Sequence, residues 1–315
     1  MTRPSSIQSS ILARIGATPL LELRSIAAEN SARILIKIES ENPTGSMKDR
    51  MALAMIAAAE RDGRLARGGN VVEYTGGSTG VSLALICAAK RYPLHIVTSD
   101  AFSLQKRDHM RALGAELTLV RSVDGGMDEA LTRNMVEMAR QIRARTGGFW
   151  TDQLNNVDQL DAYRAMGEEI WRQTDGRVDA FVQSVGTAAS LRGVAESLRD
   201  KRSDVRIVAV EPAESAVLSG HETGVHKIEG IGAGFVVPLW DPGVVDEIAT
   251  VSTDEAKGMA RRLARTEALL AGTSTGANLV AALRVAERLG SGATVVTVMC
   301  DSGIKYLGTD QYQER

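Results

Sequence analysis

Runs of aliphatic residues alternate along the chain with segments in which apolar and polar residues recur at helical spacing. The aliphatic runs are nearly continuous, as is typical of strands covered on both faces. They predict strands at 33–39, 70–75, 94–98, 116–120, 178–185, 206–211, 247–252 and 293–300. The other segments predict helices at 47–61, 79–90, 103–113, 128–145, 159–174, 188–200, 253–265 and 277–289. This alternation predicts an α/β fold with mostly parallel sheets and right-handed crossovers.

Size and charge narrow the class of protein. The chain has 315 residues, 44% of them hydrophobic and 24% charged, and a net charge of −2. This length favours about two domains. The near-neutral, evenly spread charge argues against nucleic acid and anionic membranes as partners. No apolar run is long enough to span a membrane, and the polar N-terminal residues do not resemble a signal peptide, so we expect a cytoplasmic protein.

The cysteines and histidines offer no redox or metal motif. Cys87 and Cys300 lie far apart in apolar surroundings, and we expect both to be buried and unpaired. The four histidines show no zinc-ligand spacing. The sequence therefore predicts no metal site.

One lysine stands at a position that could make it reactive. Pro43 and Gly45 predict a loop, and Ser46 and Asp49 have the spacing of a capping box, so Lys48 falls in the first turn of the next helix. The positive end of the helix dipole disfavours an ammonium there. A partly neutral lysine is a nucleophile that can form Schiff bases. From the local sequence alone, an ordinary solvated lysine near a helix start is the preferred interpretation, since most lysines are exposed.

Three segments share the pattern of a strand, a loop of small residues and a helix. These are 75–80, 186–190 and 272–276. Small residues let the backbone approach a ligand, and a helix start directs N–H groups at an anion. A single such loop is weak evidence, because tight turns between a strand and a helix use glycine for purely structural reasons. Three of them at the carboxyl ends of predicted strands indicate a ligand site.

Familiar nucleotide motifs do not fit these loops. The glycines at 230–234 lack the strand and helix that a dinucleotide fingerprint needs, and no loop continues into Gly-Lys-Ser/Thr. The ligand that remains has a phosphate, a carboxylate partner and a carbonyl that reacts with lysine. Pyridoxal phosphate acting on an amino acid meets this description.

At this point the chain resembles the cysteine synthase (O-acetylserine sulfhydrylase) family, a branch of the fold-type II pyridoxal-phosphate enzymes. The resemblance covers nearly the whole chain. The matching segments are 16–20, 42–50, 75–80, 151–156, 186–190, 226–235 and 301–307. It implies a tryptophan synthase β-like fold of two domains with twisted, mostly parallel sheets flanked by helices and pyridoxal 5'-phosphate in the cleft. The implied domains are a larger cofactor-binding one at 1–41 plus 151–315 and a smaller, movable substrate-binding one at 42–150.

The resemblance also implies a role for each site residue. Lys48 becomes the Schiff-base lysine and the base at Cα. The residues implied to bind the cofactor, besides Lys48, are Ser78, Gly186, Thr187, Ala188, Ala189, Ser190, Gly230 and Ser274. Those implied to bind the substrate are Thr75, Gly76, Gly77, Thr79 and Gln153. Ser274 is assigned to the pyridine nitrogen, where a hydroxyl donates to a neutral ring and favours β-elimination over transamination or racemisation.

The implied reaction is β-replacement on an activated L-serine, by default O-acetyl-L-serine plus sulfide giving L-cysteine and acetate. Two departures from the family bear on it. The family's Thr-Ser-Gly-Asn-Thr-Gly loop reads here with Gly76 and Ser78, and its Gly-Thr-Gly-Gly-Thr phosphate loop reads with Ala188 and Ala189. Other leaving groups or nucleophiles, a β-eliminating ammonia-lyase or desulfhydrase, and a cofactor-binding regulatory protein therefore stay open. The family is usually a homodimer, and docking of a serine acetyltransferase is a further expectation.

Overall fold

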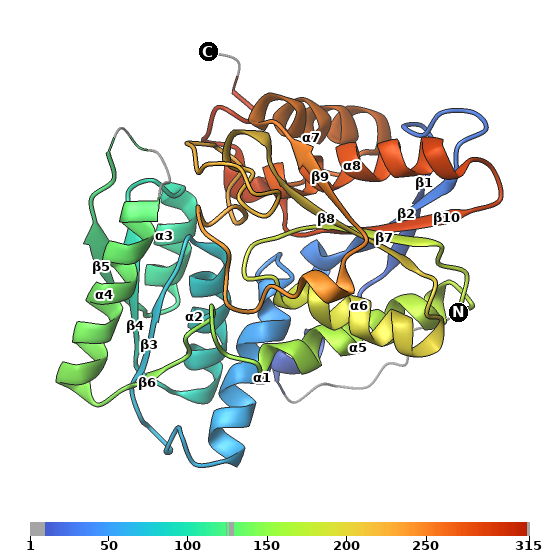
Figure 1. The fold of residues 1–315 in the computed structure, drawn as a ribbon. Coiled ribbons are helices and arrows are strands. Elements are labelled where there is room, and N and C mark those ends of the chain that lie inside the picture. The colour runs from blue at the N-terminus through green and yellow to red at the C-terminus, as the bar shows by residue number, and fades with distance from the viewer. Residues whose placement is uncertain (1–9, 124, 126–128, 314–315) are drawn as a thin grey trace.

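The computed structural model describes residues 10–123, 125 and 129–313, and the expected first residue of the 128–145 helix and the N-terminal segment lie outside them. The described chain forms two sheets that lie side by side, each with helices on both faces (Figure 1). Strands covered on both faces explain the continuous aliphatic runs of the sequence.

The larger sheet has six strands in the order β1-β2-β10-β7-β8-β9. β1 pairs with β2 in antiparallel orientation, and the other neighbours are parallel. Val295 on β10 fixes the register at its centre, since it pairs with Ile34 on one side and Ala180 on the other. The strands are β1 (Leu20–Leu23), β2 (Arg33–Ile38), β7 (Ala180–Ser184), β8 (Arg206–Pro212), β9 (Glu247–Val251) and β10 (Thr294–Met299).

The smaller sheet has four parallel strands in the order β5-β4-β3-β6. They are β3 (Val71–Tyr74), β4 (Leu94–Ser99), β5 (Glu116–Val120) and β6 (Phe149–Trp150). Its strands all come from residues 71–150, and the larger sheet takes its strands from both sides of that stretch. The division into domains and the mobility of the smaller one stay predictions.

Eight helices of the described chain complete the layers. They are α1 (Lys48–Arg61), α2 (Ser78–Lys90), α3 (Leu104–Ala112), α4 (Glu129–Thr146), α5 (Gln159–Gln173), α6 (Ala189–Lys201), α7 (Thr253–Glu267) and α8 (Thr273–Leu289). In Figure 1, α7 and α8 lie above the larger sheet and α5 and α6 below it. α1 packs against both α5 and α2, so its apolar residues join the cores of both sheets. Its first residue, Lys48, is thereby placed between them.

The structure confirms the α/β class and all sixteen elements predicted from the pattern, to within a few residues. Two strands escaped prediction because β6 has two residues and β1 four with mixed burial, too short for a pattern. α8 begins at Thr273 and not at 277, which puts Ser274 inside its first turn.

The predicted capping box at Ser46 is wrong. Met47 occupies the N-cap position of α1, and no side chain caps it there. Ser46 Oγ accepts from Lys48 N at 3.2 Å, but the Asp49 carboxylate accepts from Thr44 N at 2.8 Å and Thr44 Oγ1 at 2.5 Å. The preceding turn brings Thr44 within reach of Asp49, and the carboxylate stabilises that turn in place of the helix start.

The described residues also bear on the expectations for the cysteines, for membrane spans and for metal sites. Cys87 and Cys300 are buried and free, as predicted. In the described part of the chain, no helix is long and apolar enough to cross a membrane, and no group of three acidic, histidine or cysteine side chains is arranged to hold a metal.

Candidate active site

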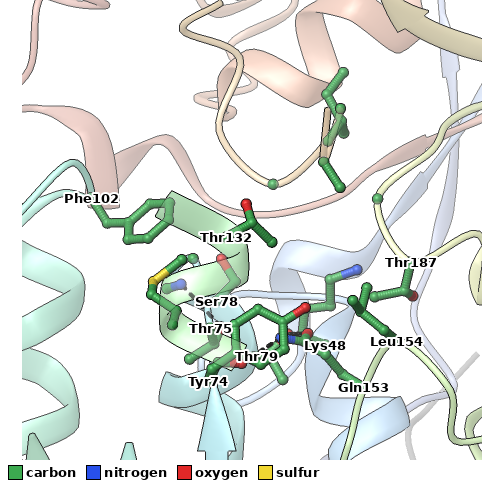
Figure 2. Close-up of a pocket in the computed structure, with 18 of the residues that line it drawn as sticks. Lys48, Tyr74, Thr75, Ser78, Thr79, Phe102, Thr132, Gln153, Leu154 and Thr187 are labelled. Atoms are coloured by element: carbon green, nitrogen blue, oxygen red, sulfur yellow. Dashed lines mark hydrogen bonds between the residues drawn. The ribbon is translucent and has the colours of Figure 1, made fainter. Parts of the chain in front are cut away.

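Two adjoining cavities open where the carboxyl ends of strands from both sheets face each other. The outer one encloses about 770 Å³ and the inner one about 400 Å³, both including space open to solvent. The inner cavity is the one on the side of α8, since Ser274 lines it. The two share a set of lining residues, namely Lys48, Ser78, Gly186, Gly230 and Ile231. Figure 2 shows the outer cavity, with Lys48 projecting into it.

The structure brings together the residues that the sequence singled out. The outer cavity is also lined by Thr75, Gly76, Gly77, Thr79, Gln153 and Thr187. The inner cavity adds Ser190 and Ser274. Ala188 and Ala189 lie in the same turn as Gly186 and Thr187 but line neither cavity, so any part they play is through the backbone.

Lys48 is half-buried, and its amine faces the cavities. Burial lowers the pKa of the Lys48 amine, and the nearby Asp301 carboxylate opposes this shift. The sequence attributed such a shift to the helix start, whereas the structure identifies burial as its main cause. A lowered pKa raises the fraction of neutral amine, the form that is nucleophilic and that accepts a proton.

The 75–80 segment turns sharply between β3 and α2. Gly77 has φ 129° and ψ −68°, a conformation closed to residues with a Cβ, and its N–H donates to Thr75 Oγ1 at 3.1 Å. At Gly76 a Cβ would lie 2.8 Å from the Phe102 ring, which is buried and lines the same cavity. Phe102 therefore fills the space that a larger side chain at position 76 would need.

Gln153 crosses from the loop after β6 to the 75–80 segment. Its Nε2 donates to the Tyr74 carbonyl at 2.7 Å, and its Oε1 accepts from Thr79 Oγ1 at 2.8 Å. Thr75, Thr79 and Gln153 are each buried yet line the cavity. Their hydroxyls and amide form a buried polar patch on the wall of the outer cavity, which Lys48 also lines (Figure 2). The Thr75 hydroxyl and the second Nε2 proton of Gln153 are donors that suit a carboxylate, and Thr79 could join them by turning its proton away from Gln153.

The hydroxyl proton of Ser78 already has a partner within the protein. Its Oγ donates to Asp301 Oδ2 at 3.2 Å, and the Tyr306 hydroxyl donates to the same oxygen at 2.8 Å. The single proton of Ser78 is thus committed to Asp301. A ligand oxygen in the inner cavity would meet Ser78 as an acceptor.

The 186–190 segment leads from β7 into α6. Ala188 has φ 69°, in the left-handed region, and α6 begins at the next residue. Thr187 Oγ1 donates to Gln159 Oε1 at 3.2 Å, and Ser190 Oγ accepts from Gln183 Nε2 at 2.8 Å. The helix start leaves backbone N–H groups directed at the cavity side, the arrangement that favours an anion such as phosphate.

Ser274 lies in the first turn of α8 and lines the inner cavity. Position 272, at the N-cap of this helix, has no room for a side chain, because a Cβ on Gly272 would lie about 2.2 Å from Asp301 Oδ1 and 2.7 Å from the Tyr306 ring. The neighbouring Cys300 is kept as a thiol, since burial raises its pKa to about 11. Ser274 therefore presents a neutral hydroxyl to the cavity beside a neutral thiol, and such a hydroxyl can donate to an unprotonated ring nitrogen.

These donors fit pyridoxal phosphate. A cavity-facing lysine of lowered pKa, a helix start for the phosphate and a hydroxyl for the ring nitrogen border one space. A Cβ at Gly186 would lie 2.5 Å from the Gly230 carbonyl oxygen, so the two segments approach as closely as glycine permits. This close approach shapes the cradle between the lysine and the helix start.

Sequence reasoning missed several lining residues. Asp301 and Tyr306 lie in a segment that matches the family but received no role. Phe102 and Lys106 gave no signal, because they come from the β4–α3 connection and α3, far along the chain from the motifs. Lys106 Nζ donates to Glu229 Oε2 at 2.6 Å and Tyr306 OH at 2.9 Å, linking α3 to the large-sheet side of the site.

Comparison with known proteins agrees with this geometry. The family described as "Pyridoxal-phosphate dependent enzyme" matches residues 11–301. The chain belongs to this family. The predicted resemblance, fold class and cofactor are thereby confirmed.

Individual members of the family are similar over nearly the full chain. A cysteine synthase of Staphylococcus aureus is 40% identical over 300 residues, which are 95% of each chain. A crystal structure of cysteine synthase (OASS) from Entamoeba histolytica has a TM-score of 0.92 and 35% identity, covering 100% of this chain and 94% of that one. An O-acetylserine dependent cystathionine beta-synthase from Helicobacter pylori has a TM-score of 0.91 and 30% identity, covering 98% and 100%.

Proposed function

We propose that this chain is a cysteine synthase that replaces the acetoxy group of O-acetyl-L-serine with sulfide, giving L-cysteine and acetate. The observation that carries the proposal is the common cavity of Lys48, the Thr75–Thr79–Gln153 patch and the 186–190 helix start. The similarity to cysteine synthases over 95% of the chain supports it.

Lys48, Ser274 and the 186–190 segment would hold the cofactor by its aldehyde, ring nitrogen and phosphate. When bound, pyridoxal phosphate supplies an electrophilic carbon for the substrate's amine and a ring that withdraws electrons from Cα. Ser78 Oγ, whose own proton goes to Asp301, would accept a hydrogen bond from a protonated oxygen substituent of the ring. Gly230 would close the cavity over the ring from the large-sheet side.

The chain's own residues then orient the substrate and move its protons. Thr75, Thr79 and Gln153 would bind the α-carboxylate, with the backbone of Gly76 and Gly77 close behind. This positions Cα toward Lys48, whose neutral amine would take the Cα proton. The C–O bond to acetate would break and a C–S bond would form at the β-carbon, so that sulfide contributes the sulfur and acetate leaves. Lys48 would then return the proton to Cα, which completes L-cysteine.

Loss of the reactive lysine tests the proposal directly. Lys48→Ala should lower turnover of O-acetyl-L-serine with sulfide by about a hundred- to ten-thousand-fold, since the amine acts as base. L-Cysteine release by the holoenzyme is the measurement. Lys90→Ala is the matched control, because Lys90 pairs with Glu60 at the far end of α2. Wild-type activity in Lys48→Ala would refute the role of Lys48.

The nature of the reaction is tested by the products. O-Acetyl-L-serine, O-phospho-L-serine, L-serine and L-cysteine, each with and without sulfide, separate the alternatives. Pyruvate and ammonia in place of L-cysteine would support β-elimination. A serine hydroxyl at the ring nitrogen, as proposed for Ser274, is compatible with that reaction too. A bound cofactor whose absorbance responds to none of the four would favour a regulatory role.

We further propose that residues 42–150 move as a unit and close on the substrate, and that the chain forms a homodimer. Lys106, Glu229 and Tyr306 join the two sides of the site, so closure would make or break these contacts. Small-angle scattering with and without L-serine tests the movement, and the mass in solution tests the dimer. Docking of a serine acetyltransferase is testable by mixing the two proteins.

A further inference from the structure

A carboxylate lies in the interior of the smaller sheet. Glu73 belongs to β3, whose four residues are all buried, and it is fully shielded from solvent. Its neighbours Val72 and Tyr74 pack in the apolar core under α4. Burying a carboxylate is costly unless its oxygens are hydrogen-bonded, so the donors around Glu73 reveal what the residue stabilises.

Four donors surround the two oxygens of Glu73. Oε1 accepts from Tyr74 N at 2.8 Å and from Trp150 Nε1 at 3.2 Å. Oε2 accepts from Thr151 Oγ1 at 2.5 Å and from Gln153 N at 2.9 Å. Three of these donors belong to the short stretch 150–153, which leaves β6 and carries Gln153 to the cavity.

We propose that Glu73 is a positioning residue that holds Gln153 in place to bind the substrate's α-carboxylate. The proposal rests on the proposed function of Gln153. Gln153 is fixed at both ends, since Glu73 binds its backbone N–H and its side chain bridges the Tyr74 carbonyl and Thr79. Without Glu73, the backbone at 151–153 would lose the anchor that sets its distance from the 75–80 segment.

The hydrogen bonds continue from Gln153 to the 186–190 segment on the other side of the cavity. Gln159 Nε2 donates to the Gln153 carbonyl at 2.7 Å, and Gln159 Oε1 accepts from Thr187 at 3.2 Å. Gln159 is fully buried at the start of α5. Glu73 therefore stands at one end of a hydrogen-bonded chain that runs through Gln153 and Gln159 to the 186–190 segment.

The protonation of Glu73 gives this positioning a pH dependence. Burial raises the pKa of Glu73 to about 7, against the hydrogen bonds from Thr151, Gln153 and Trp150, and the negative charge of Asp152 raises it further. Tyr74, beside it on β3, is kept neutral because burial raises its pKa. Above pH 7 the carboxylate accepts from all four donors, whereas below pH 7 the proton it gains weakens its bond to Gln153 N.

The test compares ligand binding in wild-type and Glu73→Gln holoenzyme. The probe is L-alanine, which has the α-carboxylate and α-amino group but no leaving group, and its Kd is read from the absorbance of bound cofactor. Glu73→Gln should raise this Kd about tenfold at pH 8, as expected on losing a hydrogen bond to a charged group. The ratio of the two Kd values should shrink toward one below pH 7, where wild-type Glu73 is neutral as well. In turnover, KM for O-acetyl-L-serine should rise more than kcat falls.

Two further variants keep the test falsifiable. Glu60→Gln is the matched control, since Glu60 is a half-buried carboxylate on α1 that accepts hydrogen bonds from Lys90 and Tyr92 and does not line the cavities. If Glu73→Gln does not fold, Glu73→Asp retains the charge with a shorter reach and should raise Kd while keeping the pH dependence. Equal Kd values for Glu73→Gln and wild type across the pH range, or a ratio independent of pH, would overturn the proposal. L-Alanine binding needs no turnover, so a protein that binds it but does not convert O-acetyl-L-serine fails the proposed reaction alone.

Discussion

The 75–80 and 186–190 segments solve the same structural problem with different backbones. Each turns from a parallel strand into a helix, and each has a residue of positive φ at the N-cap, Gly77 in one and Ala188 in the other. Gly77 has φ 129° and ψ −68°, outside every region open to residues with a Cβ. Ala188 has φ 69° and ψ −19°, at the edge of the left-handed well that such residues can enter at a cost of about 1–2 kcal/mol.

This difference explains which departures from the family's motifs the fold can accept. The 186–190 segment tolerates alanine at a position that is glycine in the family's motif, because its conformation is strained but allowed. Its helix start keeps the N–H groups that an anion needs. The 75–80 segment has no such freedom at Gly77, and its departures fall on the flanking Gly76 and Ser78 instead. Tolerance therefore follows the local dihedral angles and not the chemical role of the loop.

The largest effect should come from adding a methyl group at position 77. In Gly77→Ala the Cβ would meet Lys106 Cδ at 2.5 Å in addition to the forbidden dihedral angles. We expect the free energy of unfolding to fall by about 2–4 kcal/mol, from backbone strain and overpacking together. L-Alanine affinity should fall too, because Thr75 and Thr79 flank the displaced residue. Urea denaturation measures the free energy of unfolding, and the absorbance of bound cofactor measures L-alanine affinity.

The matched control for this change is Gly63→Ala. Gly63 also has a positive φ, of 82°, but a Cβ there would meet no atom within 4 Å, and the residue lies away from the cavity. It should cost stability through strain alone and leave L-alanine binding unchanged. Equal losses in the two variants would show that the contact with Lys106 contributes nothing.

The sequence alone was sufficient to predict the site residues that stand in recognisable motifs. Lys48, Ser274 and Gln153 stand in motifs, and the structure places all three at the paired cavities. The fold followed from long, strongly patterned elements, whereas β1 and β6 were too short to be seen. Phe102 and Lys106 depend on how α3 and its preceding loop pack, which no local pattern encodes. Glu73 did leave a trace, as a lone charge within an aliphatic strand, but its partners 77–80 residues away are visible only in the fold.

A smaller effect is expected at Gly76, where space and not conformation is limiting. A Cβ there would lie 2.8 Å from Phe102 Cε1, and φ at this position is not positive. Gly76→Ser should therefore lower the free energy of unfolding by about 1–3 kcal/mol through overpacking. Combined with Phe102→Leu, which vacates the ring's position, the serine should cost at least about 1 kcal/mol less than it does alone. Urea denaturation of the four proteins gives this coupling, and strictly additive losses would rule out the steric pairing of the two residues.

The smallest effect should come from restoring glycine at position 188. Ala188→Gly relieves about 1–2 kcal/mol of left-handed strain. It also gives up the burial of one methyl group, about 0.8 kcal/mol, and about 0.4–1 kcal/mol of unfolded-state entropy. These contributions nearly cancel, so the free energy of unfolding should stay within about 1 kcal/mol of wild type, and cofactor affinity should be unchanged because the N–H groups are retained. A loss above about 2 kcal/mol would show that the packing of the Ala188 methyl group outweighs its strain, and packing, not a tolerant backbone, would then explain the alanine at this position.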